Sequence, residues 1–218
     1  MIGEDLLRYK NNIKYVYFDM ETWNLCLNFC FNRPFEIECL ESIGKNTINS
    51  TNLLINWLNE KPDLFIENDV ALINHYNKDK VLKEGLDPKA AFNIFWPKLQ
   101  NAEFIIIHNG LNFDCHLLKE YALYMNADWK FLLPKIIDTN ALAKGIKLGI
   151  KFDKDKESFL NYQFRIASIV QKGLKTNLKL LCKEYDINIE DESLLYSASY
   201  DTSINKLLWE KMIWQIEY

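Results

Sequence analysis

The 218-residue sequence predicts a single α/β domain covering residues 1–218. Short runs of β-branched and aromatic residues alternate along the chain with segments in which apolar residues recur at helical spacing. No repeat, low-complexity tract or Gly/Ser-rich linker divides the sequence. The two patterns and the lack of a linker together favour one domain.

Apolar, β-branched or aromatic runs predict strands at 13–20, 25–31, 35–40, 52–58, 104–107 and 136–139. The second and third of these are separated by a predicted turn at Asn32-Arg33-Pro34, because Asn and Pro favour turns. The run at 104–107 is apolar throughout, which predicts a buried strand.

Apolar residues at helical spacing predict helices at 88–99, 114–125, 157–172, 177–185 and 201–212. The first begins at Asp87-Pro88, where a capping carboxylate precedes a proline at the first helical position. Residues 144–175, in which basic and apolar residues interleave, are the least regular part of the chain and are expected to be an insertion.

The composition excludes several classes of protein. A net charge of −4 argues against a broad basic surface for nucleic acid, but it allows an acidic site that meets a polyanion through divalent metal ions. The five cysteines are scattered, so no disulfide framework is expected. No apolar run is long enough for a membrane span and the N-terminus lacks a signal-peptide layout, so we expect a cytoplasmic protein with no membrane association.

Two carboxylates end the first predicted strand. Side chains alternate along a strand, so Asp19 and Glu21 project from the same face, roughly 6–7 Å apart. Ionised carboxylates at that separation repel each other, and Mg²⁺ or Mn²⁺ is a natural bridging charge. Taken alone, the pair favours a simpler interpretation, a strand that emerges into solvent.

Two further acids change that balance. Asp114 and Asp201 each open a predicted helix, where a carboxylate can serve simply as a cap or as a favourable first-turn charge. Four acids at the ends of core elements are also the arrangement required by a two-metal phosphodiester site, in which the ions lie ~3.5–4 Å apart.

The acids occur within three segments whose order is informative. These are Phe18-Asp19-Met20-Glu21-Thr22, His108-Asn109-Gly110-Leu111-Asn112-Phe113-Asp114 and Tyr196-Ser197-Ala198-Ser199-Tyr200-Asp201. They resemble the three motifs of the DnaQ-like 3′–5′ exonucleases of the DEDD superfamily. The second segment has one residue more between Asn109 and Phe113 than the commonest form, and is nearer to the proofreading domains of family B polymerases.

Four other segments resemble the family in the expected order: 33–37, 74–76, 138–143 and 177–182. The resemblance covers about residues 13–212. It implies a ribonuclease H-like fold, with a mixed central sheet of about five strands flanked by α-helices.

The resemblance also implies a role for each acid. Asp19 would bridge two divalent cations, Mg²⁺ or Mn²⁺. Glu21 and Asp201 would complete the site that activates water, and Asp114 would support the second ion.

Three residues match positions that contact nucleic acid in the family. Thr22 and Leu25 match those that hold the 3′-terminal nucleotide, with Leu25 as a wedge and Thr22 reaching toward the sugar. Asn109 is a weaker match for a backbone contact.

The sequence departs from the family at the residue that orients or deprotonates the attacking water. One branch of the family has His five positions before the last Asp, and the other has Tyr four positions before it. Here Tyr196 lies five positions before Asp201 and Ser197 four. Tyrosine is a weaker base than histidine near pH 7, so Tyr196 either hydrogen-bonds the water or only packs ahead of the helix.

Other residues have a structural and a functional interpretation. His108 is expected to cap a turn rather than to take part in catalysis. Lys144, Lys147, Lys151 and Arg165 either follow a phosphate backbone or form a solvated face. Trp23 is a candidate for base stacking.

The sequence therefore predicts a metal-dependent 3′–5′ exonuclease that acts on single-stranded DNA ends and releases nucleoside 5′-monophosphates. The alternatives are the same chemistry on RNA and a catalytically weakened nucleic-acid-binding or accessory module on the same fold. Because the chain ends soon after the last predicted helix, a free-standing enzyme is expected rather than a proofreading subunit.

Overall fold

The computed structural model describes residues 11–27, 31–64 and 66–216. At its centre is a five-stranded mixed sheet with the strand order β3-β2-β1-β4-β5. The strands are β1 (Lys14–Thr22), β2 (Pro34–Ile43), β3 (Asn46–Leu54), β4 (Phe104–Ile107) and β5 (Ile136–Asp138). The first three are antiparallel neighbours, whereas β4 and β5 extend the sheet beyond β1 as parallel strands. The predicted mixed sheet flanked by helices is confirmed.

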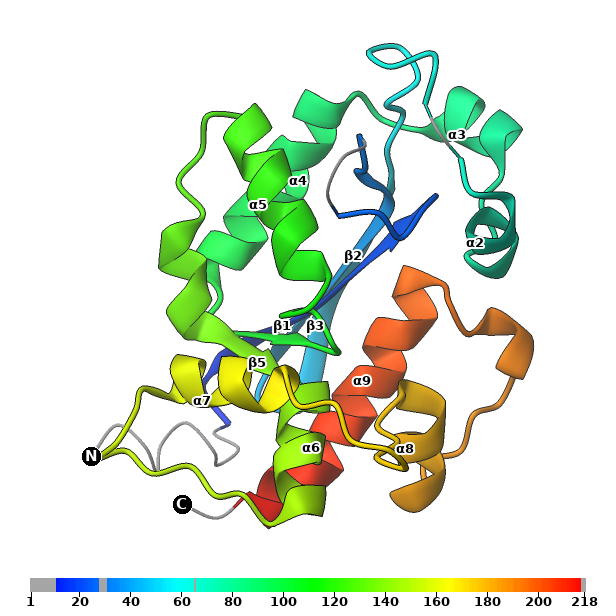
Figure 1. Cartoon of the computed structure of the whole chain (residues 1–218). Helices are drawn as coiled ribbons and strands as arrows, with labels where there is room; N and C mark the ends of the chain where they lie inside the picture. The colour runs from blue at the N-terminus through cyan, green and yellow to red at the C-terminus, as the bar shows by residue number, and fades with distance from the viewer. Residues whose placement is uncertain (1–10, 28–30, 65, 217–218) are drawn as a thin grey trace.

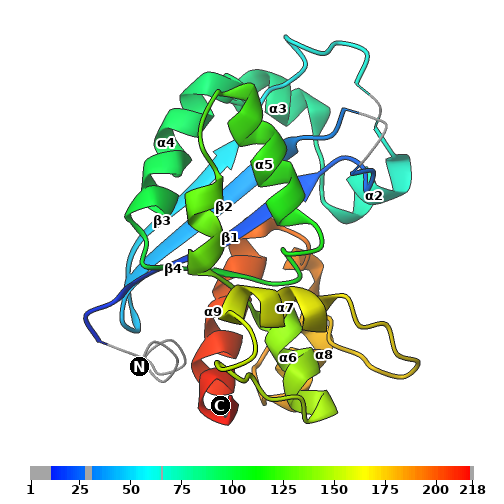
Figure 2. The ribbon, with the colours of Figure 1, turned by 60° about the vertical axis from the view of Figure 1, so that its left-hand side comes forward.

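Helices cover both faces of this sheet (Figures 1 and 2). On one face lie α4 (Pro88–Asn101) and α5 (Asp114–Tyr124), and on the other α9 (Ala198–Met212) packs on β1 and β2. The described residues also form α2 (Asn68–Ile73), α3 (Lys78–Glu84), α6 (Thr139–Leu148) and α8 (Leu178–Glu184). A further helix, α7 (Phe159–Ala167), closes the β5 edge, where the Gln163 amide accepts from the Asp138 N–H and donates to the Ile136 carbonyl.

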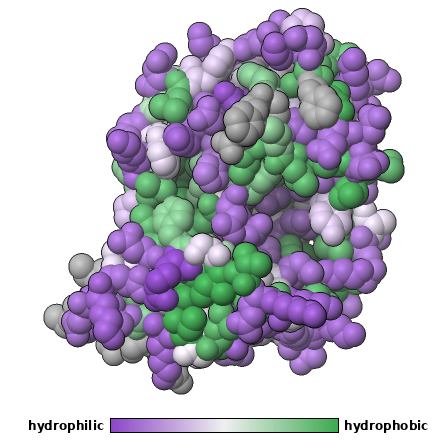
Figure 3. All heavy atoms as spheres, viewed as in Figure 1, coloured by the Kyte–Doolittle hydropathy of each residue, from purple (hydrophilic) through white to green (hydrophobic). Residues whose placement is uncertain are grey.

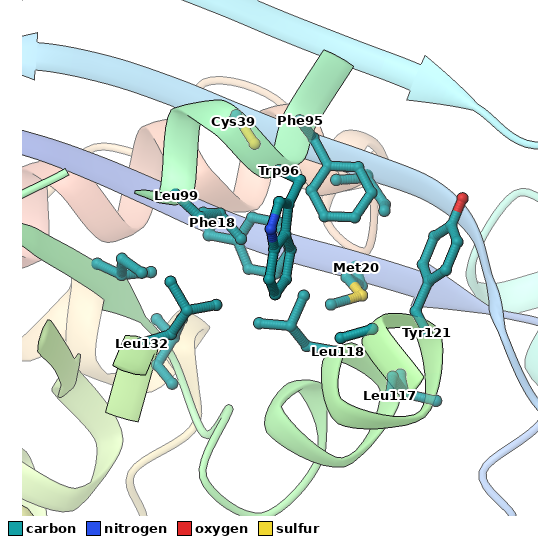
Figure 4. Packing of buried hydrophobic residues seen from close by; sticks show 14 of the residues in the cluster. Phe18, Met20, Cys39, Phe95, Trp96, Leu99, Leu117, Leu118, Tyr121 and Leu132 are labelled. Atoms are coloured by element: carbon teal, nitrogen blue, oxygen red, sulfur yellow. The ribbon is translucent and has the colours of Figure 1, made fainter. Parts of the chain in front are cut away.

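Alternation along β1 divides its side chains between two hydrophobic clusters. Val16, Phe18 and Met20 face α4 and α5, where they pack with residues such as Phe95 and Leu118 (Figure 4). The opposite face of β1 begins with two tyrosines that pack under α9 and continues with the two acids, as Tyr15, Tyr17, Asp19 and Glu21. The acidic pair thus occupies positions that the strand pattern directs toward α9.

Two predicted strands are corrected by the structure. Residues 25–27 form no strand, because side chains hold them as a loop: the Asn24 side chain accepts from the Cys26 N–H, and the Asn32 amide donates to the Asn24 and Cys26 carbonyls. The rest of that prediction, 28–30, lies outside the described residues. The strand expected at 52–58 instead runs from Asn46 to Leu54 as an exposed edge strand, whose polar residues do not show the apolar pattern.

The helix predictions are correct in place and differ at their ends. The helix expected at 157–172 is the shorter α7, and the last helix begins at Ala198 because the Ser197 side chain caps it by accepting from the Tyr200 N–H. The short helices α2 and α3 were not predicted. No helix within the described residues has both the length and the apolar character needed to cross a membrane.

Candidate metal centre and active site

Three of the four predicted metal ligands meet at the end of β1. Asp19 and Glu21 project from that strand, and Asp201 approaches them from the first turn of α9. One carboxylate oxygen from each of the three lies within 4.8 Å of the other two. Oxygen ligands grouped in this way suit Mg²⁺ or Mn²⁺.

The hydrogen bonding of Asp201 also fits a cation. Its Oδ2 accepts from the Tyr196 N–H at 3.3 Å, whereas its buried Oδ1 has no hydrogen-bond partner among the described residues. Buried carboxylate oxygens are almost always satisfied, because an unpaired one loses its hydration without compensation. A divalent ion shared with Asp19 and Glu21 would satisfy it.

Asp114, the fourth predicted ligand, lies beside this group at the start of α5. It is 6% exposed, and its Oδ1 accepts from the Met20 N–H at 3.1 Å. This bond fixes the carboxylate against the backbone between Asp19 and Glu21. Asp114 is not one of the three whose oxygens converge within 4.8 Å.

Burial raises the pKa of all four carboxyl groups. For Asp19, the neighbouring charges of Asp114, Glu21 and Asp201 add to the effect of burial, in that order. The pKa of Asp114 is raised to about 7 and that of Asp201 to about 6, in both cases chiefly by burial, and that of Glu21 is also raised well above its usual range. Bound divalent cations would lower these pKa values by supplying opposite charge.

A fifth acid, Glu36 of β2, adds to the negative potential. In the antiparallel register Glu36 is opposite Glu21, so both side chains lie on the same face of the sheet. The charge of Glu36 raises the pKa of Asp19, Glu21 and Asp201, and its carboxylate accepts from the Asn52 amide at 2.6 Å. Sequence reasoning missed Glu36 because its place beside the site depends on strand register.

The four predicted metal ligands line a cavity of about 760 Å³. On the face shown in Figure 3, both hydrophilic and hydrophobic residues border the central hollow. One part of its wall carries amides, from Asn109, Asn112, Asn140 and Asn205. Another part is apolar and includes Leu25, Val70 and Ile73. The cavity therefore combines an acidic site with both polar and apolar contact surfaces.

The predicted substrate-binding residues differ in their access to this cavity. Leu25 lines it and is 63% exposed. Asn109 also lines it, with a left-handed φ of 61° and its N–H donating to Asp138 Oδ1 at 2.9 Å. Thr22 is buried, and its hydroxyl donates to the Asn24 carbonyl at 2.7 Å. In this conformation the hydroxyl does not point toward a sugar in the cavity, as the resemblance implied.

Tyr196 also lines the cavity and is 54% exposed. Its backbone has a left-handed φ of 68°, which is uncommon for a residue other than glycine. The N–H of Tyr196 donates to Asp201, so the segment that carries the tyrosine is joined directly to a candidate metal ligand.

The imidazole of His108 lines the cavity, and its Nδ1 lies 2.9 Å from the Thr139 hydroxyl. Burial lowers the pKa of His108 to about 4, so the ring is neutral near pH 7. Trp23 is 1% exposed and packs against Phe35 and Tyr76, which excludes the expected stacking on a base in this conformation.

Three of the four basic residues considered for phosphate binding make contacts within the protein. Lys144 donates to the Ala167 and Ile169 carbonyls. Lys147 pairs with Glu184, and Arg165 pairs with Glu157. These contacts favour a structural role over phosphate binding.

The fold and this site together define a ribonuclease H-like α/β architecture with an acidic centre at the end of its first strand. Among solved structures, the chain is similar to E. coli exonuclease I in complex with a dA16 oligonucleotide, with a TM-score of 0.68 and 13% identity over 93% of this chain and 41% of that one. It is also similar to the zinc-bound form of the E. coli exonuclease I complex with single-stranded DNA, with a TM-score of 0.67 and 13% identity over 92% of this chain and 40% of that one.

A third similar structure is a complex of exonuclease I with SSB-Ct, with a TM-score of 0.64 and 14% identity over 92% of this chain and 42% of that one. The chain thus spans about two fifths of the length of these proteins. No protein-family model matches the sequence, and no curated protein matches it either. The likeness confirms the predicted ribonuclease H-like fold.

Proposed function

We propose that the protein is a metal-dependent 3′–5′ exonuclease that hydrolyses phosphodiesters at the 3′ ends of single-stranded DNA and releases nucleoside 5′-monophosphates. The observation that carries this proposal is the convergence of Asp19, Glu21 and Asp201 oxygens within 4.8 Å on the wall of an open cavity. The cavity volume of about 760 Å³ lies in the usual range for sites that take small organic ligands, which is adequate for a nucleotide.

Two cations, Mg²⁺ or Mn²⁺, would supply the positive charge that activates water and stabilises a leaving oxygen. In the proposed site Asp19, Glu21 and Asp201 hold the ions, and Asp114 completes the set from its anchored position beside β1. Leu25 packs against the terminal base, and Asn109 contacts the nucleic-acid backbone. Tyr196, which lines the cavity, would orient the attacking water through a hydrogen bond from its hydroxyl.

Two features bear on the alternatives. Structures of E. coli exonuclease I with a dA16 oligonucleotide and with single-stranded DNA support DNA over RNA as the substrate, through the shared fold. The tyrosine at the position where relatives use histidine favours, as a second candidate, a catalytically weakened module that binds nucleic acid.

The test is hydrolysis of a 5′-labelled single-stranded DNA oligonucleotide with Mg²⁺ or Mn²⁺. A ladder shortened from the 3′ end by wild type, and not by Asp19→Ala, is expected. Glu190→Ala, which removes an exposed acid that is not among the residues lining the cavity, is the control and should retain activity. Equal inertness of wild type and Asp19→Ala would exclude the enzyme, and binding without cleavage would favour the weakened module. Faster cleavage of an RNA of the same sequence would reverse the substrate preference.

A further inference from the structure

The corner between α2 and α3 is connected to both sides of the acidic site. The Asn74 amide donates to the carbonyl of Thr22, the residue that follows Glu21, at 2.8 Å. The next side chain, His75, places its Nε2 3.2 Å from the carbonyl oxygen of Leu195. Two consecutive side chains therefore reach the end of β1 and the segment that leads into α9.

The contact of His75 continues through a single peptide group to a candidate metal ligand. The Leu195 carbonyl accepts from His75, and the N–H of the same peptide, on Tyr196, donates to Asp201 Oδ2 at 3.3 Å. Because a carbonyl only accepts, His75 must carry its proton on Nε2. Hydrogen bonds at both ends of one peptide fix its plane and polarise each other. His75 thereby orients the donor that orients the Asp201 carboxylate.

The backbone at His75 has the geometry of a common helix end, which decides the substitution that best removes the imidazole. His75 lies in the left-handed region, with φ 56°, directly after the C-cap of α2. The Tyr76 N–H donates to the Ala71 carbonyl at 2.8 Å, which is the bond of a Schellman motif, where glycine is the usual residue. Tyr196, on the other side of the contact, is left-handed as well. Asn126 has the same conformation at the end of α5, so the left-handed φ alone assigns no role to His75, and the contact with the Leu195 carbonyl carries the inference.

We propose that Asn74 and His75 are positioning residues that set the distance between the β1 carboxylates and Asp201, and so determine the affinity of the site for divalent cations. The inference rests on the proposed function of this site as a metal centre. Asn74 acts through the Thr22 carbonyl, and His75 acts through the peptide between Leu195 and Tyr196.

His75→Gly is the most informative variant. It removes the imidazole and suits a φ of 56°, so it preserves the helix end. Asn126→Gly is the matched control, because Asn126 is exposed, has φ 54° and follows the C-cap of α5 in the same type of turn, away from the cavity. Mn²⁺ affinity is measured by paramagnetic resonance of the free ion, and metal-free stability by thermal unfolding with chelator.

We expect His75→Gly to weaken Mn²⁺ binding about tenfold, which is the lower end of the effect for residues that orient metal ligands. The unfolding temperature of the metal-free protein should be unchanged or slightly higher. Asn126→Gly should leave the Mn²⁺ affinity at its wild-type value. Wild-type Mn²⁺ affinity in His75→Gly would overturn the proposal. So would metal-free destabilisation by His75→Gly that is absent from Asn126→Gly, because the contact would then serve the fold.

Amide hydrogen exchange in the metal-free protein separates this inference from the proposed function. His75→Gly should speed exchange at the Tyr196 amide, because the peptide loses its fixed plane, and this readout needs no metal. If the wild type binds no Mn²⁺, the proposed metal centre is wrong, and so is the proposed effect of His75 on cation affinity. Faster exchange of the Tyr196 amide in His75→Gly would still support the contact that positions this peptide. Unchanged exchange together with unchanged affinity would refute both parts of the inference.

Discussion

The burial of Asp114 predicts that removing its negative charge stabilises the metal-free protein. Asp114→Asn is the cleanest change, because the asparagine oxygen can still accept from the Met20 N–H that Asp114 Oδ1 now binds at 3.1 Å. The side chain keeps its size and its anchor to β1. Only the charge and one potential metal ligand are lost.

The magnitude follows from the pKa of Asp114. Burial, with a further contribution from the charge of Asp138, raises this pKa from the ordinary 3.8 to about 7, against the opposing hydrogen bonds from the Asp114 and Met20 backbone amides. A tenfold change in proton affinity corresponds to about 1.4 kcal/mol, so full ionisation of Asp114 destabilises the fold by up to about 4 kcal/mol. Because the folded-state pKa is the higher one, this penalty is absent below about pH 4 and complete above about pH 7.

The assay is urea unfolding with chelator at about pH 4.5, where most of the penalty is absent, and at about pH 8, where it is complete. Asp114→Asn should raise the free energy of unfolding by about 2–4 kcal/mol at the higher pH and by much less at the lower one. Asp128→Asn is the control: Asp128 is exposed, and it also accepts a backbone N–H, from Lys130, so no comparable gain is expected. A gain of the same size at both pH values, or a loss at pH 8, would refute the electrostatic explanation.

Three more outcomes are expected. Tyr196→Phe should lower the hydrolysis rate about 100-fold. The Mn²⁺ affinity should be unchanged, because the hydrogen bond from the Tyr196 N–H to Asp201 remains. An unchanged rate would assign the ring to packing. Leu25→Ala should raise KM for an oligonucleotide without altering unfolding, since the side chain is 63% exposed; a large drop in stability would contradict a wedge role. Mg²⁺ at 100 times its Kd should stabilise the wild type by about 2.7 kcal/mol near pH 8 and by less near pH 5, where the carboxylates bind protons instead; no effect in unfolding scans would argue against a metal site.

The sequence is most informative where local pattern and burial agree. The apolar run of β4 and the capped start of α4 are both found where they were predicted. It is least informative where polar residues form structure at the surface, as in β3, or where side-chain hydrogen bonds replace a strand, as around Asn24. Neither feature gives a periodic pattern of apolar residues in the sequence, because neither depends on the burial of one face of an element.

The same distinction applies to the candidate site. Asp19, Glu21 and Asp201 were predicted together because each lies at the end of a predicted element, within a segment that resembles a family motif, and the structure brings their oxygens together. The roles of Glu36 and His75 were not predicted, because one depends on the register of β1 with β2 and the other on a contact between residues 120 positions apart. Thr22 was expected to face the sugar, and local hydrogen bonding to the Asn24 carbonyl turns its hydroxyl inward instead.

The position of the acids within β1 explains how the fold tolerates them. The face of β1 opposite the acids buries Val16, Phe18 and Met20 against α4 and α5, and full burial of such a side chain contributes about 1.5–3 kcal/mol. We therefore expect β1 to stay in place without metal, and the repulsion to act on the segment around Tyr196 that leads into Asp201, where the Tyr196 side chain is 54% exposed. For this reason we expect cation binding and the His75 contact to affect the same part of the molecule, with their largest effects on amide exchange at residues 195–201 and small effects in β1.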